Sequence, residues 1–70
     1  MQHFFADPSC VDGEQIRLAG SDVNHMKNVL RMKPGEEMWV SDGEGMDYFC
    51  SVEGYEGKEA ILRVVKKEVS

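Results

Sequence analysis

Several features that define large classes of proteins are scarce in this sequence. Its 70 residues contain two cysteines and two prolines. No hydrophobic run approaches the roughly 20 residues that a transmembrane helix needs. The first five residues, Met-Gln-His-Phe-Phe, lack a basic segment followed by a long apolar one, so they are not typical of a secretory signal. We therefore expect a cytoplasmic protein with no membrane partner.

The few cysteines and histidines are also badly spaced for a metal site. Cys10 and Cys50 lie far apart, as do His3 and His25, and no C-x-x-C or H-x-x-x-H pair is present. A disulfide between the two cysteines is an open alternative, but cysteines in a cytosolic chain are more often reduced. The sequence predicts no bound metal and two free thiols.

The residues that carry covalent catalysis are missing as a set. No nucleophile, histidine base and acid occur in a recognisable order, and there is no dinucleotide-binding fingerprint. The segment Asp42-Gly43-Glu44-Gly45 lacks the ligand spacing of a calcium loop, and its glycines favour a hairpin turn instead. We expect no catalytic residue and no cofactor-binding residue in this chain.

Positive charge is in the minority. Eight lysines and arginines stand against 13 acidic residues, for a formal net charge of -5, which by itself counts against a nucleic-acid partner. The segment from residue 23 to residue 32 nevertheless contains no acid. It holds His25, Lys27 and Arg31, and Lys33 follows directly. A second basic group lies near the end of the chain, at Arg63, Lys66 and Lys67. A local positive face on an acidic domain is therefore expected.

What is present is enough for one small domain over residues 1–70. A hydrophobic share of 41% argues against disorder, although a chain this short has a small core and marginal stability. Alternation predicts strands at residues 3–6, 15–18, 37–42, 46–53 and 60–65, with loop at residues 9–13 and a turn at residues 54–58. With one helix between the second and third strands, the pattern predicts a mainly β fold, a small barrel of about five strands.

The candidate core follows from the same alternation. Ile16 and Leu18 should face inward from one strand, and Met38 and Val40 from the next. The aromatic residues Phe4 and Phe5 are also expected in the core.

The predicted helix organises the charged residues. Ser21 is a candidate N-cap, and a 100° step per residue places Val23, Met26, Val29 and Leu30 on one buried arc. Lys27 and Arg31 then share an exposed edge, beside Asn24 and Asn28. Lys33-Pro34-Gly35-Glu36 ends the helix in a type II turn.

Each candidate contact residue has a structural alternative. Lys27 and Arg31 could hold RNA phosphates, or Arg31 could be paired with Asp42 or Asp47. His25 could stack on a base or bond a 2′-hydroxyl, but a histidine that bonds a loop carbonyl is the simpler interpretation. His3 is interpreted in the same way.

Trp39 lies opposite Met38 and Val40 along its strand, so it faces either outward or under the helix. An outward tryptophan would mark a contact with RNA or with another protein surface. Covering by the helix is the interpretation that we favour.

Taken in order, four motifs resemble the N-terminal domain of the RsmE family, bacterial ribosomal RNA small subunit (uracil-N3)-methyltransferases. The motifs are His3-Phe4-Phe5, His25 followed by Val29-Leu30-Arg31, Lys33-Pro34-Gly35-Glu36, and Asp42-Gly43-Glu44-Gly45. The resemblance covers nearly the whole chain and implies a PUA-like β-barrel that binds RNA. It also implies a following SPOUT domain, absent from these residues, that is knotted, binds S-adenosylmethionine, dimerises and methylates N3 of a uridine.

Three hypotheses follow. In the first, the domain docks small-subunit ribosomal RNA through His25, Lys27, Asn28, Arg31 and Lys33 on behalf of a homodimeric methyltransferase. In the second, it is an interaction module that packs on its own catalytic domain or a partner subunit, with little RNA contact. In the third, it is an independent small barrel that is complete at Ser70.

Overall fold

Alternating apolar and polar residues form strands in the computed structural model, which describes residues 3–69 of the chain. The strands are β1 (His3–Phe5), β2 (Val11–Asp12), β3 (Gln15–Ala19), β4 (Glu37–Ser41), β5 (Met46–Glu56) and β6 (Glu59–Val69). Between them lie the 3-10 turn η1 (Pro8–Cys10), the helix α1 (Ser21–Asn24) and the π-helical turn η2 (His25–Val29), which continues α1.

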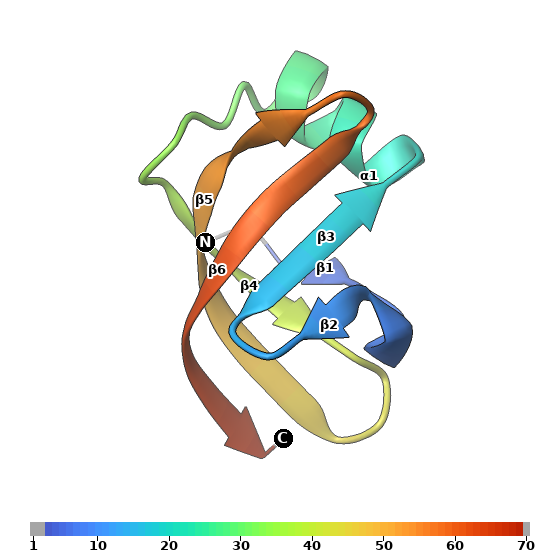
Figure 1. The fold of residues 1–70 in the computed structure, drawn as a ribbon, viewed down its shortest axis with the longest axis vertical. Helices are drawn as coiled ribbons and strands as arrows, with labels where there is room; N and C mark the ends of the chain where they lie inside the picture. Colours follow the sequence, from blue (N-terminus) through green and yellow to red (C-terminus); the bar gives the residue numbers. More distant parts are fainter. Residues whose placement is uncertain (1–2, 70) are drawn as a thin grey trace.

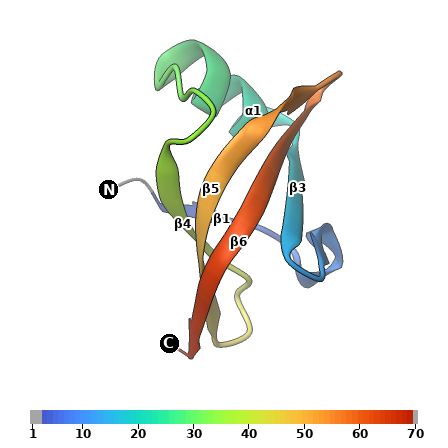
Figure 2. The same ribbon diagram turned by 60° about the vertical axis from the view of Figure 1, so that its left-hand side comes forward.

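The strands form one curled sheet in the order β1-β4-β5-β6-β3-β2. All neighbours in this sheet are antiparallel except β1 and β4, which are parallel. Figures 1 and 2 show the sheet as a half-barrel, with α1 and η2 at one end and the β4–β5 hairpin at the other. The prediction of a mainly β fold, a small PUA-like barrel with one short helix, is confirmed.

The sheet has one strand more than predicted. Val11 and Asp12, expected in a loop, pair with Ile16 and Gln15 of β3. Gly13 makes the tight turn between them, with φ at 62°. A strand of two residues is too short to show alternation, so periodicity alone does not reveal it.

Strands β5 and β6 are longer than the alternation predicts. The expected turn at residues 54–58 is shorter, because β5 continues to Glu56 and pairs there with Glu59. The register between the two strands shifts twice, between Phe49 and Cys50 and between Val52 and Gly54. Such bulges interrupt alternation and bend the strand, so they hide its continuation in the sequence while they help the sheet to curl.

The core fills the inside of the curl. The predicted inward residues Ile16, Leu18, Met38 and Val40 are all buried. Phe4 is buried as well, but Phe5 is 62% exposed, so its predicted burial is wrong. Successive residues of a strand point to opposite faces, and Phe4 takes the inner one. Burial also raises the pKa of the Cys50 thiol to about 11, and both cysteines are free.

The helix differs from its prediction in two respects. Gly20, not Ser21, is the residue before the helix, and no side chain caps its first N–H groups. Val23 and Met26 are buried as predicted, whereas Val29 is 62% exposed. The reason is the change from an α-helical to a π-helical turn, in which the Leu30 N–H donates to the His25 carbonyl at 2.9 Å. This wider turn rotates later residues away from the arc expected for a regular helix.

The turn after the helix is as predicted. The Glu36 N–H donates to the Lys33 carbonyl at 3.0 Å, and Gly35 has a φ of 96°. Positive φ at this position, after Pro34, is the conformation of a type II turn. Asp42-Gly43-Glu44-Gly45 likewise forms the predicted hairpin connection between β4 and β5.

Candidate nucleic-acid interface

The five predicted RNA-binding residues lie in one exposed stretch of chain. His25, Lys27 and Asn28 belong to η2, while Arg31 and Lys33 follow it, and all five side chains are exposed. The expected single edge for Lys27 and Arg31 is wrong, because Arg31 lies beyond the helix in the left-handed conformation, with φ at 52°. The positively charged residues Lys27, Arg31 and Lys33 therefore lie on consecutive turns of an irregular segment.

This segment is tied firmly to β5. The Tyr55 hydroxyl donates to the Met32 carbonyl at 2.7 Å. The Gly35 N–H donates to the Val52 carbonyl, and the Val52 N–H donates to the Glu36 carbonyl, both at 2.8 Å. The backbone that carries Arg31 and Lys33 is consequently positioned by the sheet.

Lys27 is held by an aromatic ring. Its Nζ lies 5.5 Å from the centroid of the Tyr55 ring, within the range of a cation–π contact. Partial burial, with the negative charge of Glu36, raises the pKa of the Tyr55 phenol, so the hydroxyl stays protonated at neutral pH. The Lys27 side chain is exposed beside this ring.

The carboxylates that could have paired with Arg31 are occupied. Asp42 accepts hydrogen bonds from the backbone N–H groups of Glu44 and Met46, at 2.7 and 3.2 Å. Asp47 accepts one from the Ser41 hydroxyl at 2.6 Å. Neither carboxylate forms an ion pair with Arg31 in the described part of the chain, so the alternative in which Arg31 pairs with Asp42 or Asp47 is wrong.

Within residues 3–69 the ion pairs are Arg17–Glu59, at 3.1 Å, and Lys66–Glu68, at 3.7 Å. None of the cations at positions 27, 31 and 33 takes part in them. The carboxylate of Glu36, three residues after Lys33, accepts the backbone N–H of Lys33 at 2.6 Å. The local positive face expected from the sequence is present.

The two histidines have separate surroundings. The His25 ring meets Phe4 edge-on, with centroids 6.2 Å apart, and no side-chain hydrogen bond of His25 to a carbonyl is found among the described residues. His3 Nε2 lies 2.7 Å from the Ser41 hydroxyl, which donates its proton to Asp47. This His3–Ser41–Asp47 chain is not a catalytic triad, because a catalytic histidine accepts the serine proton.

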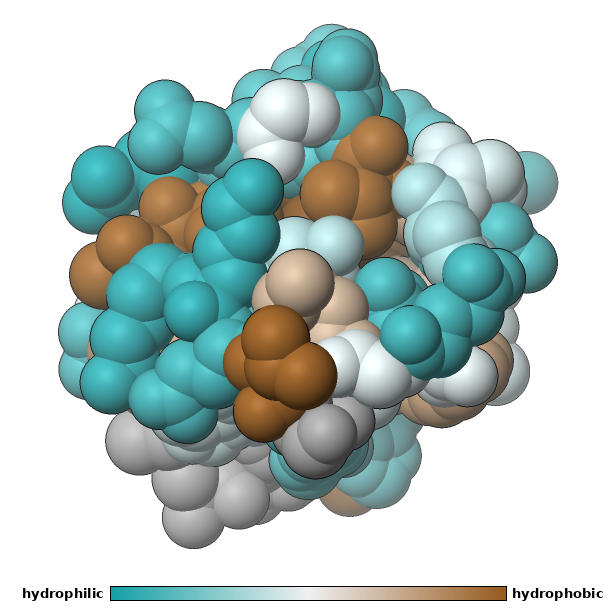
Figure 3. Space-filling view, turned by 90° about the horizontal axis from the view of Figure 1, so that it is seen from below, coloured by the Kyte–Doolittle hydropathy of each residue, from teal (hydrophilic) through white to brown (hydrophobic). Residues whose placement is uncertain are grey.

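Trp39 lies on the outer face of the sheet. Its ring packs on Phe49 at 5.1 Å between centroids, and Lys66 Nζ lies 5.7 Å from the Trp39 centroid. The helix packs on the opposite face, where Met38 and Val40 are buried, so the favoured interpretation that the helix covers Trp39 is wrong. In Figure 3, which views the molecule from the hairpin end, hydrophobic residues form separate groups among hydrophilic ones.

A hollow beside the predicted RNA-binding residues is lined in part by residues that the sequence did not indicate. Its volume is about 290 Å³, and it lies between the helix and the β5–β6 turn. The lining residues are Gly20, Val23, Asn24, Lys27, Asn28, Gly57 and Lys58. Lys58 was not a candidate, because only the pairing of β5 with β6 brings its turn to the helix. Gly57 and Lys58 indicate a turn in the sequence, but they do not indicate which element that turn lies against.

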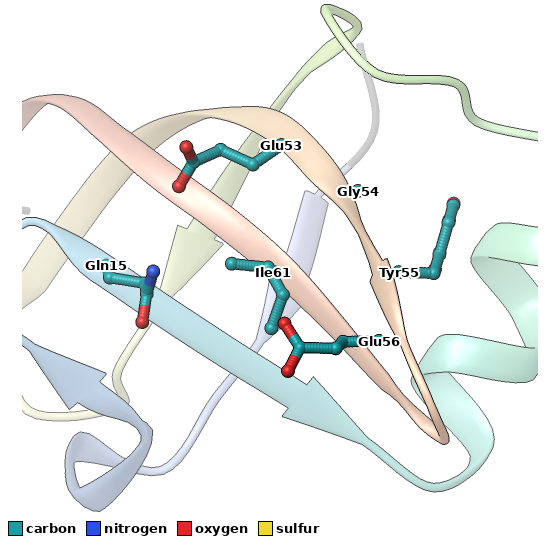
Figure 4. Close-up of a pocket in the computed structure, with 6 residues that line it drawn as sticks. All are labelled: Gln15, Glu53, Gly54, Tyr55, Glu56 and Ile61. Atoms are coloured by element: carbon teal, nitrogen blue, oxygen red, sulfur yellow. The ribbon is translucent and has the colours of Figure 1, made fainter.

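A second hollow, of about 390 Å³, has the opposite character. Figure 4 shows the carboxylates of Glu53 and Glu56 and the Gln15 amide around Ile61, with the Tyr55 side chain turned away from them. Such an acidic lining does not suit an anionic polymer. Among the described residues, no group of three or more His, Cys, Asp or Glu could hold a metal ion.

None of the helices within residues 3–69 has both the length and the apolar character required to cross a membrane.

Comparison with known proteins decides the family. The family model described as the RNA methyltransferase PUA domain matches residues 18–65, more than half of the chain. The chain belongs to this family. The resemblance to the N-terminal domain of the RsmE methyltransferases is thereby confirmed. A search of curated proteins finds no match.

Solved structures agree with this PUA domain in fold. A predicted RNA methyltransferase from Thermotoga maritima superposes with a TM-score of 0.84 at 24% identity, over 100% of this chain and 31% of that one. A probable rRNA-methyltransferase from Porphyromonas gingivalis gives 0.83 at 24% identity, over 100% and 28%. The ribosomal RNA small subunit methyltransferase E from Neisseria gonorrhoeae, bound to S-adenosyl methionine, gives 0.79 at 25% identity, over 97% and 28%. The PUA domain thus spans about a third of the length of each of these chains.

Proposed function

We propose that this PUA domain docks ribosomal RNA for an S-adenosylmethionine-dependent enzyme that methylates N3 of a uridine in small-subunit ribosomal RNA. The family match and the likeness to the neisserial small-subunit methyltransferase support this proposal. His25, Lys27, Asn28, Arg31 and Lys33 form the contact surface.

The observation that carries the proposal is the free positive charge on an acidic domain. Overall net charge is -5, yet Lys27, Arg31 and Lys33 make no ion pair within residues 3–69. Unpaired, exposed lysine and arginine side chains are the groups that displace counterions from a phosphate backbone. Phosphate contacts of this kind position RNA without reading its sequence.

The chemistry belongs to other parts of the proposed parent enzyme. The two hollows described above are lined by carboxylates or by lysine and asparagine, and neither is enclosed by the apolar side chains that usually hold a small organic cofactor. Neither of these two hollows suits S-adenosylmethionine. We assign it to a SPOUT domain of a homodimeric parent, in the cytoplasm, with ribosome biogenesis as the process served.

Binding of labelled small-subunit ribosomal RNA at low and moderate salt tests the docking role. We expect weak, salt-dependent binding of the domain, with a Kd of about 10⁻⁴ to 10⁻⁶ M. The double variant Lys27→Glu/Arg31→Glu should weaken it about tenfold or more, since it removes two cations and adds two anions at the contact. Lys66→Glu/Lys67→Glu, with the same charge change near the end of β6, should have a much smaller effect.

Two results would count against docking. Equal losses in both double variants would show that only net charge matters. Unchanged RNA affinity of the intact parent after the Lys27 and Arg31 reversals would remove the docking role altogether.

A second function, an interaction module that packs on the catalytic domain or a partner subunit, is favoured by one observation. The outer-face pair Trp39 and Phe49 is only partly buried, as tryptophans at protein interfaces often are before association. If this function holds, Trp39→Ala should weaken association between domains or subunits of the parent while RNA affinity stays the same.

A further inference from the structure

We propose that the hollow between the helix and the β5–β6 turn is a subsite for one ribose-phosphate unit of single-stranded RNA, in which Lys58 contacts the phosphate and Asn28 recognises the 2′-hydroxyl. This inference rests on the docking function proposed above and names the chemistry of one part of the same surface.

The lining is built for an anion. Lys27 comes from η2 and Lys58 from the turn that joins β5 to β6, so lysines of two different elements line the hollow. None of the seven lining residues is acidic. Glu56, on the other side of this turn, lines the separate acidic hollow, and Glu59 is held by Arg17 at 3.1 Å. A phosphate therefore finds positive charge on both sides of this hollow.

The size fits a single unit of the polymer. At about 290 Å³ the hollow lies just below the range of about 300 to 1,000 Å³ that is usual for sites that enclose a small molecule. Gly20 and Gly57 add no side chain to its lining, and the space beside each of them is open, since no atom lies within 4 Å of a Cβ added at either position. An open, shallow hollow of this kind can hold one unit of a strand that enters and leaves along the surface.

The two asparagines supply a donor and an acceptor. Asn28 Nδ2 donates to Asn24 Oδ1 at 2.6 Å. This bond fixes both amides and leaves Asn24 Nδ2 and Asn28 Oδ1 without a partner among the described residues. The Asn24 amide can donate to a phosphate oxygen, and Asn28 Oδ1 can accept from a hydroxyl. Ribose has that hydroxyl at the 2′ position and deoxyribose does not, so Asn28 can distinguish RNA from DNA.

Binding of oligouridine RNA and oligodeoxyuridine DNA of equal length tests the subsite, with the fluorescence anisotropy of a terminal label as the measurement. Lys58→Glu should weaken RNA binding by about 3- to 10-fold at low salt and flatten the dependence of log affinity on log salt by about 0.7, the contribution of one phosphate contact. Lys67→Glu makes the same charge change on the same β-hairpin, far from the hollow, and should weaken binding less than about 2-fold.

The RNA-to-DNA affinity ratio isolates the asparagine. The unchanged protein should favour RNA by about 3- to 10-fold, the effect of one hydrogen bond, and Asn28→Ala should bring the ratio close to one. Gln15→Ala, which removes an amide from the acidic hollow, should leave the ratio unchanged. Circular dichroism of each variant shows whether the fold is intact.

The outcomes separate this inference from the function on which it rests. If the unchanged protein fails to bind RNA at low salt, both fall. If it binds, and the Lys27/Arg31 reversal weakens binding while Lys58→Glu equals Lys67→Glu, the subsite is wrong and docking stands. An RNA-to-DNA ratio that Asn28→Ala does not change overturns the assignment of the hydroxyl contact.

Discussion

Tyr55 connects the sheet to the cationic segment with a single side chain. Its hydroxyl bonds the Met32 carbonyl, and its ring lies under Lys27. Both contacts join residues more than twenty positions apart, and neither is visible in a sequence that places Tyr55 in a turn. The exposure of Lys27 and Arg31, by contrast, could be predicted, because long charged side chains are rarely buried without a partner.

Tyr55→Phe should lower the free energy of unfolding by about 0.5–1.5 kcal/mol, since it leaves the Met32 carbonyl without its donor. The folded-state pKa of Tyr55 is raised, so its contribution to stability is fully present below the unfolded pKa of about 10 and is lost as the pH rises through the folded value. Urea unfolding of both proteins should give a difference that is constant near neutral pH and shrinks in this alkaline range. A difference that persists at high pH would contradict the assignment.

Arg31 stands where a glycine would be expected. Among the described residues it is the one non-glycine with positive φ, and it closes η2 in the manner of a helix C-terminus, where glycine is common. The left-handed conformation costs roughly 1–2 kcal/mol for a residue with a Cβ. An arginine at this position costs stability and places a charge on the proposed RNA-binding surface.

Arg31→Gly should therefore stabilise the fold by about 0.5–1 kcal/mol, after the greater backbone entropy of glycine in the unfolded chain is subtracted. The same variant should weaken RNA binding severalfold, because it removes one phosphate contact. Thermal unfolding and RNA titration on the same samples test both effects. Arg31→Ala is the control, since it removes the charge without relieving the strain.

Local sequence patterns predicted the regular parts of the helices and strands but not their irregular parts. Alternation identified the inward faces of β3 and β4, and turn residues located the turns at residues 33–36 and 42–45. The π-helical turn was not predictable, because a step of 100° per residue assumes a regular helix. The bulges of β5 were hidden for the same reason. The π-helical turn departs from the helical period, and the bulges depart from the two-residue period of a strand, on which the predictions depend.

The β4–β5 hairpin contains one glycine with a second role. Gly43 and Gly45 both have positive φ, at 77° and 94°. A Cβ at Gly43 would lie 2.7 Å from two atoms of the Phe5 ring, whereas nothing lies within 4 Å of one at Gly45. The exposed Phe5 thus rests against the backbone of the hairpin.

Gly43→Ala should destabilise the domain by about 1–3 kcal/mol more than Gly45→Ala, because overpacking adds to the backbone strain that both variants share. Denaturant unfolding measures the two differences. In a Phe5→Ala background the excess should disappear, and equal costs for the two variants in the original background would contradict the contact.

At the scale of the molecule, opposite charges are sorted to the two sides of the β5–β6 turn. Lys27 and Lys58 line the hollow between the helix and this turn, whereas Glu53 and Glu56 line the acidic hollow. The net charge of -5 therefore conceals a separated distribution, one that composition alone cannot report. Such a distribution favours one orientation of an approaching polyanion.

A small core makes the whole domain sensitive to single cavities. Leu62 is fully buried and pairs with Ile16 on one side and Val52 on the other. Leu62→Ala should cost about 2–5 kcal/mol, a large part of the total for a chain of this length. Val65→Ala, at a half-exposed position of the same strand, should cost less than about 1 kcal/mol. The thermal unfolding midpoints of the two variants measure these costs. Similar midpoints would contradict the placement of Leu62 in the core.

The parallel pairing of β1 with β4 has a consequence for biosynthesis. Phe4 of β1 lies opposite Val40 of β4, so β1 must wait for a strand that is made much later. Strand β3 must wait longer still for β6, because Ile16 lies opposite Leu62, while the remaining strand pairs form between neighbours. A nascent chain emerging from the ribosome will expose Phe4 and its unsatisfied amide edge throughout that delay. These two long-range pairings, β1 with β4 and β3 with β6, should then be the slowest events of folding and the steps most dependent on help from chaperones.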